Sequence, residues 1–226
     1  MTRTTGSSES APGYEGFTNA SDNSNLIDLL LAHDQAALVV VDVQNDYCHP
    51  DGALGLAGFD LSTIDPMCDV IEDLISTARV VEVPVIFLQN IHSDATDTPA
   101  WRRKTKHGMA NCREGTWGAE FYRVEQTASD RVVVKHRYSG FVGTNLSQVL
   151  GAVGRTTLVM TGTATNVCVE STARHACMLD YDVVIVEDGV AATDAAAHSG
   201  TLQNLDRFFG HVVASEKVQM VWKDAA

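Results

Sequence analysis

Short apolar runs alternate with amphipathic segments along this chain, and that alternation limits the possible folds more than any other feature. The first run, 37–43, is apolar except for Asp42, as expected for a strand buried on both faces of a sheet. Further strands are predicted at 83–89, 131–135, 156–161, 182–187 and 211–214. Helices are predicted at 60–80, 144–153, 167–179 and 194–209. The pattern indicates βαβ units, and therefore a three-layer α/β/α sandwich with a mainly parallel, doubly wound sheet of about six strands.

The chain length and the polar N-terminal segment suggest one domain with an arm. The chain has 226 residues, of which 45% are hydrophobic, and we expect a single domain over 25–226. Residues 1–24 are rich in Ser, Thr, Asn and Gly, which predicts a polar tail, either disordered or ordered against a partner subunit. A short helix is expected over 26–31.

Charge and hydropathy exclude several classes of function. The formal net charge is −13 and the pI about 4.8, without the basic stripe that nucleic-acid binding requires. No apolar run is long enough to span a bilayer, and the N-terminus lacks the apolar centre of a secretory signal. We therefore expect a cytoplasmic protein without nucleic-acid or membrane partners.

Five widely spaced cysteines favour free thiols over a disulfide framework or a zinc site, because their number is odd and no CxxC pair occurs. Cys168 differs from the others in its context. It follows the apolar run 158–160, at the end of a predicted strand, and a turn through Gly162, and a helix is predicted to begin near it. The amide groups and dipole of a helix N-terminus favour a thiolate, which can attack a carbonyl carbon.

Three ionisable residues are predicted at the carboxyl ends of strands, where open α/β sheets bind ligands. They are Asp42, Lys135 and Cys168. A carboxylate can accept the thiol proton, and an ammonium group can stabilise both anions. Each residue alone also has a structural interpretation: a loop cap for Asp42, a solvated amine for Lys135 and a core residue for Cys168.

Three motifs resemble those of the isochorismatase-like cysteine hydrolases, and they occur in the family's order between about residues 37 and 209. The first is VDVQNDYC at 41–48, followed by GAL at 52–54. The second is KHRYSGF at 135–141, and the third is GTATNVCVEST at 162–172.

The resemblance implies a role for each motif residue. Cys168 would be the nucleophile, Asp42 the general base and Lys135 the third member of a triad. The peptide between Thr163 and Ala164 would be cis, and the backbone N–H groups of Ala164 and Cys168 would form the oxyanion hole. The presence of Cys168 favours amide hydrolysis, because family members that hydrolyse a vinyl ether lack this cysteine.

The resemblance also bears on metals and cofactors. Nicotinamidases of this superfamily carry an Asp-x-His metal motif after the second strand. Here the corresponding residues are Asn90 and His92, and a single His near Asp94 is more typical of a surface pair. We therefore expect no catalytic metal and no cofactor.

Among members of the family, the chain most resembles ureidoacrylate amidohydrolases, through LAGFD at 56–60, FLQN at 87–90, RYSGF at 137–141 and ATNVCVEST at 164–172. Hydrolases of biuret, triuret and N-carbamoylsarcosine, and other small-amide amidases, are alternatives. Asn90 and Tyr138 are candidate hydrogen-bonding contacts to a ureido group, and Trp117 is a candidate apolar wall. Loop capping by Asn90 and core packing by Trp117 and Tyr138 are the structural alternatives.

The long connection at 90–130 is predicted to be a binding loop or lid, or else a peripheral insertion with its own helix. It departs from the ureidoacrylate pattern at 98–113, where it carries Arg102, Arg103, Lys104 and Lys106. This basic group either attracts a substrate carboxylate or forms a solvated face.

The expected partners are a small amide or ureido substrate and further copies of the chain. The family usually forms dimers or tetramers, so a homodimer or homotetramer is expected, with the N-terminal arm at an interface. The alternative from another class is a non-catalytic α/β binding or scaffold protein that has retained the fold, and the intact Asp42, Lys135 and Cys168 set argues against it.

Overall fold

A sheet of six parallel strands, in the order β3-β2-β1-β4-β5-β6, forms the centre of the molecule. The computed structural model describes residues 20–104 and 111–224. The strands are β1 Ala36–Val41, β2 Val85–Asn90, β3 Arg131–Lys135, β4 Thr157–Thr163, β5 Asp182–Ala191 and β6 His211–Val213. The chain builds outward from β1 in one direction and then in the other, so the predicted doubly wound parallel sheet is confirmed.

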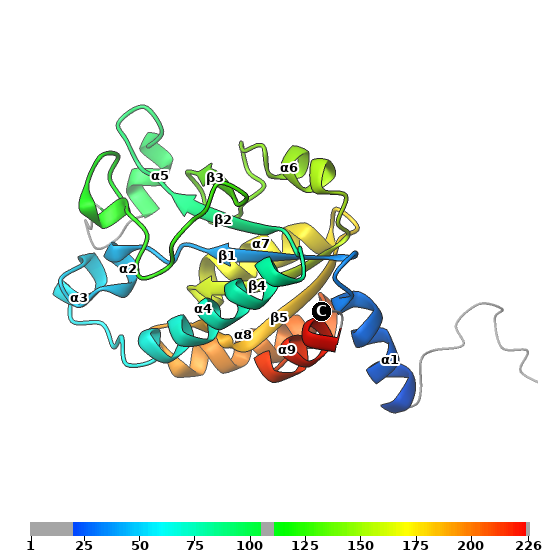
Figure 1. Ribbon diagram of the computed structural model, residues 1–226. Coiled ribbons are helices and arrows are strands. Elements are labelled where there is room, and N and C mark those ends of the chain that lie inside the picture. The colour runs from blue at the N-terminus through cyan, green and yellow to red at the C-terminus, as the bar shows by residue number, and fades with distance from the viewer. Residues whose placement is uncertain (1–19, 105–110, 225–226) are drawn as a thin grey trace, which may run out of the picture.

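Helices cover both faces of this sheet, which gives the predicted three layers (Figure 1). One layer contains α1 Ala20–Leu31, α4 Ile64–Val80 and α9 Ser215–Asp224. The other contains α6 Leu146–Val153, α7 Glu170–Cys177 and α8 Ala195–Phe208. The short elements are α2 Asn45–Cys48, α3 Ala53–Leu56, α5 Pro99–Lys104, the 3-10 turn η1 Trp117–Ala119 and the π-helical turn η2 Thr165–Val169.

Each sheet face has its own hydrophobic core, because successive strand residues point to opposite faces. Leu38, Val40 and Phe87 pack with α1, α4 and α9. On the other face, Val39 and Leu88 pack with α6, α7 and α8. The core α4 residues recur at helical spacing, which is why this segment forms a helix with one buried stripe. They are Ile64, Met67, Cys68, Ile71, Leu74, Ile75 and Ala78.

The carboxyl ends of the strands meet at one end of the molecule, on the left in Figure 1, together with α2, α3 and α5. Strand β1 ends at Val41, two residues earlier than predicted, because Asp42 adopts a positive φ of 52°. The predicted helix at 167–179 is divided into η2 and α7. Helix α9 was not predicted. It is anchored by Trp222, whose Nε1 donates to the carbonyl of Leu31 at 2.9 Å.

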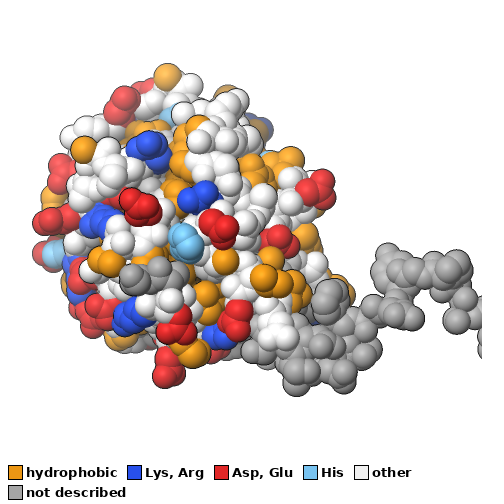
Figure 2. Space-filling model, turned by 45° about the vertical axis from the view of Figure 1, so that its right-hand side comes forward, with side chains coloured by type: hydrophobic (Ala, Val, Ile, Leu, Met, Phe, Trp, Pro, Cys, Tyr) orange, Lys and Arg blue, Asp and Glu red, His pale blue; other side chains and the backbone are white. Residues whose placement is uncertain are grey.

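Helix α1 begins at Ala20, earlier than the expected 26–31, and the remainder of the predicted tail lies outside the described residues. No helix in the described part of the chain is long and apolar enough to cross a membrane. All five cysteines are free, as predicted. Acidic and basic side chains are interspersed with apolar ones on the face shown in Figure 2, which gives no sign of a basic stripe on that face.

Candidate active site

A buried ion pair joins the ends of β1 and β3. The Lys135 Nζ lies 2.7 Å from Asp42 Oδ2, and both side chains are fully buried. Nζ also donates to the carbonyl of Arg137 at 3.0 Å. Burial raises the pKa of Asp42, with Lys135 opposing that shift. Burial by itself lowers the pKa of Lys135, but the neighbouring Asp42 and Cys168 together outweigh burial and raise that pKa. A carboxylate with a raised pKa is a better proton acceptor than an ordinary one.

Cys168 lies beside this pair, in the π-helical turn η2 directly after β4. Its environment differs from the sequence expectation of a thiolate stabilised by a helix N-terminus. Burial raises the pKa of the Cys168 thiol well above its usual value, and Asp42 raises it further, while Lys135 opposes both. The resting thiol is therefore protonated at neutral pH, and it needs a base to become a nucleophile. Asp42 is the neighbouring group that can serve as that base.

The end of β4 requires a glycine. Gly162 has a φ of 106°, and a Cβ on this residue would stand 2.1 Å from the carbonyl oxygen of Val41 on β1. The peptide bond between Thr163 and Ala164 is cis. The Ala164 carbonyl accepts from the N–H groups of Val167 and Val169. The oxyanion hole at Ala164 and Cys168 stays a prediction from the resemblance.

Thr172 connects the nucleophile turn to the loop after β3. Its hydroxyl donates to the carbonyl of Cys168 at 2.7 Å and accepts from the N–H of Gly140 at 3.0 Å. The fully buried Thr172 side chain thus fixes the segment that carries Cys168 relative to the loop that follows Lys135. The sequence reasoning included Thr172 in a motif without giving it a role. Its four-residue spacing from Cys168 on a helical segment was the available signal.

Gln44 and Asn45, two and three residues after Asp42, form hydrogen bonds to backbone groups. Gln44 Nε2 donates to the carbonyls of Asn90 and Ala119, and its Oε1 accepts from the Asn90 N–H at 2.8 Å. Asn45 Nδ2 donates to the carbonyl of Trp117 at 2.8 Å. These bonds attach the end of β2 and the turn η1 to the segment that carries the base.

Asn90 is brought to the same edge and lies in a buried polar network. It is the last residue of β2, and it pairs with Lys135 in the register of the sheet. Its Nδ2 lies 2.6 Å from the hydroxyl of Tyr47 and 3.1 Å from Nε2 of His92. The His92 Nδ1 in turn lies 2.9 Å from the Asp97 carboxylate. The sequence predicted His92 in a surface pair with Asp94, but it is buried and its partner is Asp97.

The two predicted aromatic contacts occupy different surroundings. Tyr138 lies near the triad, since Cys168 and Lys135 both influence its pKa, which burial raises. Trp117 is 47% exposed and packs edge-on against His49 at 5.0 Å between ring centroids. The indole that contacts the polar network is instead Trp101 of α5. It stacks on His92 at 5.8 Å and lies 4.9 Å from Tyr138.

Tyr47, His92 and Trp101 are therefore the site-adjacent residues that sequence reasoning missed. The signal for His92 was its two-residue spacing from Asn90, because residues two apart in an extended segment share a face. Tyr47 lies in the first motif, five residues after Asp42. Trp101 offered no comparable signal, since only the path of the connection at 90–130 brings it near.

The geometry around His92 is not that of a metal site. Both of its ring nitrogens are engaged by protein groups, Asn90 at Nε2 and Asp97 at Nδ1. Within residues 20–104 and 111–224, no group of three or more His, Cys, Asp or Glu side chains is arranged to hold a metal ion.

The basic group of the connection is only partly described. Arg102 forms an ion pair with Asp94 at 3.1 Å, which is compatible with a solvated face. Arg103 is exposed. Lys106 and the side chain of Lys104 lie outside the described residues.

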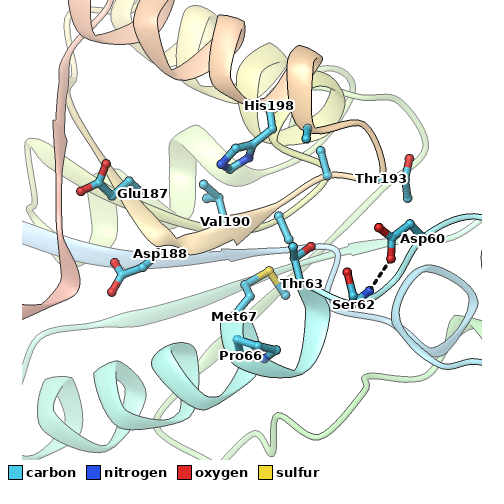
Figure 3. Close-up of a pocket in the computed structure, with 13 residues that line it drawn as sticks. Asp60, Ser62, Thr63, Pro66, Met67, Glu187, Asp188, Val190, Thr193 and His198 are labelled. Atoms are coloured by element: carbon cyan, nitrogen blue, oxygen red, sulfur yellow. Dashed lines mark hydrogen bonds between the residues drawn. The ribbon is translucent and has the colours of Figure 1, made fainter.

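A cavity of about 380 Å³ lies next to the nucleophile segment, between the beginning of α4, the end of β5 and α8 (Figure 3). His198 of α8 lines it, and the His198 Nδ1 lies 2.9 Å from the hydroxyl of Thr165, the first residue of η2. The cavity is lined by none of the three triad residues, so it is separate from the site formed by Asp42, Lys135 and Cys168.

Comparison with known proteins supports the same fold and chemistry. The isochorismatase domain model matches residues 36–217, which is most of the chain. The chain belongs to the isochorismatase family. It is 38% identical to the ureidoacrylate amidohydrolase RutB of Yersinia enterocolitica, over 78% of this chain and 84% of that protein.

Solved structures agree with this assignment. A cysteine hydrolase from Pseudomonas syringae pv. phaseolicola superposes with a TM-score of 0.79, at 29% identity over 86% of this chain and 95% of that one. The N-carbamoylsarcosine amidase of Thermoplasma acidophilum superposes with a TM-score of 0.65, at 31% identity over 80% and 97% of the two chains. The predicted family is confirmed, and the chain is an amidohydrolase of this family.

Proposed function

We propose that the protein is a metal-independent cysteine amidohydrolase that cleaves the terminal C–N bond of a small ureido or carbamoyl compound and releases ammonia. The buried Asp42–Lys135 pair beside the Cys168 thiol is the observation that carries this proposal. An ion pair without solvent access at a strand end is costly to bury, and catalysis provides a reason for it.

The first half of the reaction forms a covalent intermediate at Cys168. The Asp42 carboxylate takes the thiol proton, and the sulfur attacks the carbonyl carbon of the substrate. The backbone N–H groups of Ala164 and Cys168 hold the oxygen that becomes negatively charged. The protonated Asp42 then donates its proton to the leaving nitrogen, and ammonia departs. Lys135 stays protonated throughout and balances the negative charge as it moves between carboxylate and sulfur.

The second half restores the enzyme. Asp42 takes a proton from a water molecule, whose oxygen attacks the carbonyl carbon of the S-carbamoyl intermediate. The carbon–sulfur bond breaks, the sulfur recovers the proton, and the acyl product leaves as a carbamate. Two features support a mechanism without a metal: Asn90 stands at the position of the Asp-x-His aspartate, and both nitrogens of His92 have protein partners.

The substrate class rests on the similarity to ureidoacrylate amidohydrolases at 35–38% identity. N-carbamoylsarcosine is the second candidate, because the amidase that bears its name is 31% identical to this chain. Ureidoacrylate and N-carbamoylsarcosine both carry a terminal carbamoyl NH2. The polar groups around Asn90 and Tyr138 suit such a group better than an apolar amide.

Ammonia release across a small substrate panel tests the proposal. The panel contains ureidoacrylate analogues, N-carbamoyl amino acids including N-carbamoylsarcosine, biuret, triuret, nicotinamide and maleamate. We expect the ureido and carbamoyl compounds to give the highest kcat/KM, and treatment with a metal chelator to leave it unchanged. Preference for nicotinamide, or loss of activity with the chelator, would contradict the proposal.

The nucleophile is tested in the same assay. Cys168→Ala should lower turnover by at least about 10³-fold while the far-UV spectrum and thermal unfolding stay close to those of the wild type. The matched control is Cys177→Ala, which changes a half-buried cysteine at the end of α7. Mass spectrometry of acid-quenched wild-type enzyme should reveal an adduct on Cys168. Near-normal turnover in Cys168→Ala would end the covalent mechanism.

A further inference from the structure

The network that ends at Asn90 leaves one polar atom unsatisfied. Within the described part of the chain, the Asn90 Oδ1 is buried and has no hydrogen-bond partner. The residue itself is 5% exposed. Buried acceptors without partners are rare in native proteins, and one beside a catalytic site is a candidate for contact with a ligand. The question is what fixes this oxygen in its orientation, since an amide can rotate by 180° and exchange its oxygen with its nitrogen.

The contacts that fix the orientation of the Asn90 amide begin at Arg113. Its guanidinium lies 2.5 Å from Oδ2 of Asp97, and the Asp97 carboxyl is largely buried. Although burial opposes it, the hydrogen bond from Arg113 and the neighbouring His92 lower the pKa of Asp97. Asp97 is therefore a carboxylate at neutral pH. A carboxylate can only accept hydrogen bonds, so the His92 Nδ1 at 2.9 Å must carry a proton.

The second nitrogen of His92 is then an acceptor. Burial lowers the pKa of His92, which keeps the ring neutral with its single proton at Nδ1. The unprotonated Nε2 needs a donor, and the Asn90 amide atom 3.1 Å away must therefore be the nitrogen. The same Nδ2 lies 2.6 Å from the Tyr47 oxygen, which accepts its second proton. Both protons of the amide are thus used, and Oδ1 is left without a partner in the network.

The alternation of side chains along a strand shows on which face of the sheet the Asn90 amide lies. Ile86 and Leu88, four and two residues before Asn90, both point into the core beneath α6 and α7. Val133, two residues before Lys135, points into the same core. Asn90 and Lys135 are register partners on adjacent strands, so their side chains leave the sheet on the same face. Cys168 belongs to that core as well.

We propose that Asp97 and His92 are positioning residues that orient the Asn90 amide so that its carbonyl oxygen accepts a hydrogen bond from the terminal NH2 of the substrate. The proposal rests on the proposed amidohydrolase function and extends it with a selection rule. A substrate with an N–H at this position satisfies the buried oxygen, whereas an ester of the same shape presents a second acceptor and leaves the oxygen unpaired. The site thereby selects ureido and amide groups over esters.

The first measurement reads the orientation without any turnover. In protein labelled with 15N at histidine, ring-nitrogen shifts and two-bond couplings distinguish the two neutral tautomers. We expect His92 to carry its proton at Nδ1 in the wild type and to lose that preference in Asp97→Asn. A His92 ring protonated at Nε2 in the wild type would overturn the proposal, whatever the substrate of the enzyme is.

The second measurement reads selectivity. The best carbamoyl substrate, R–NH–CO–NH2, is compared with its methyl ester counterpart, R–NH–CO–OCH3. The kcat/KM for the carbamoyl compound divided by that for the ester should fall about tenfold or more in Asp97→Asn. The fall should come mainly from a higher KM for the carbamoyl compound. The control is Asp94→Asn. This variant removes a carboxylate of the same loop that is 91% exposed. The Asp94 carboxylate also pairs with Arg113 but forms no bond to His92 among the described residues.

The outcomes separate this proposal from the proposed function. An unchanged ratio in Asp97→Asn, or an equal fall in Asp94→Asn, would reject the positioning role even if the wild type hydrolyses ureido compounds. If the wild type hydrolyses none of the panel, the proposed function fails and the tautomer of His92 still decides the orientation of Asn90. Thermal unfolding of both variants shows whether a fall in the ratio accompanies a loss of folded protein.

Discussion

Two regions of the molecule form the candidate site, and they position their residues differently. One region is the carboxyl ends of β1, β3 and β4, and the other is the connection between β2 and β3. Asp42, Lys135 and Cys168 each lie at or just after a strand end, and the sheet determines their relative positions. His92, Asp97 and Trp101 depend on the path of a long connection and on its internal hydrogen bonds. The sheet fixes Asp42, Lys135 and Cys168, whereas the connection fixes the polar and aromatic groups around Asn90. Changes in the first region should therefore alter the rate of chemistry, and changes in the second should alter substrate preference.

The sharpest test of the first region is Asp42→Asn, where two readouts should move in opposite directions. Loss of the base should lower turnover by about 10²–10⁴-fold. The same change removes a charge that raises the pKa of Cys168 and leaves Lys135 beside the sulfur. The thiol pKa should therefore fall, and the rate of iodoacetamide alkylation of Cys168 at pH 7 should rise. Peptide mapping after timed alkylation measures this rate. Slower alkylation in Asp42→Asn would contradict the assigned electrostatics.

The geometry of the first region also depends on close backbone packing. Gly162→Ala would place a Cβ 2.1 Å from the Val41 carbonyl oxygen at a φ of 106°. We expect a loss of about 1–3 kcal/mol in the free energy of unfolding, together with reduced turnover. Gly58→Ala is the matched control, because its φ is 79° but nothing lies within 4 Å of the added Cβ. Urea titration of both variants isolates the clash, and equal destabilisation would attribute the effect to the positive φ alone.

The second region is tested by replacing Trp101 and Trp117 in separate variants. Trp101 contacts His92 and Tyr138, whereas Trp117 contacts His49. Trp101→Leu should raise KM roughly three- to tenfold with little change in the rate of alkylation of Cys168. Trp117→Leu should change KM less. Steady-state kinetics on the preferred substrate decides between them, and a larger effect at Trp117 would restore the sequence-based assignment.

The smallest effect on activity is expected for Thr172, which joins the Cys168 turn to the loop after β3. Thr172→Val keeps the shape of the side chain but removes the hydroxyl that pairs with Cys168 and Gly140. We expect a loss of about 1–3 kcal/mol in unfolding free energy, with kcat lowered more than KM is raised. Thr201→Val, at a partly buried hydroxyl of α8 that bonds Glu170, serves as the control. Equal kinetics in the two variants would limit Thr172 to a role in stability.

The grouping of Asp42, Lys135 and Cys168 was predictable because the sequence signals for their positions are local. An apolar strand followed by Asp42, or a strand followed by a glycine turn and Cys168, is readable within about ten residues, and the order of the motifs supplied the rest. The sheet topology followed from the alternation of strand and helix patterns. Helix α9 was missed because its pattern directly follows a three-residue strand and its docking depends on Trp222 reaching Leu31 across the fold.

The pKa of Cys168 and the surroundings of Trp117 could not be predicted for a different reason. Position at a helix start suggests a lowered thiol pKa, but burial against Asp42 reverses that shift, and burial is a property of the whole fold. Likewise, two indoles in one connection look equivalent in sequence. In the fold, the Trp117 carbonyl is bonded to Asn45 and its indole packs on His49, whereas Trp101 stacks on His92 of the polar network.

The presence of two separate hydrophobic cores has a consequence for how this enzyme can be altered. Cys168, Lys135 and Asn90 all belong to the face covered by α6, α7 and α8, while α1, α4 and α9 cover the opposite face. We therefore expect substitutions beneath α4 to change thermal tolerance more than turnover. That face is accordingly the place to begin when a more heat-resistant catalyst is wanted.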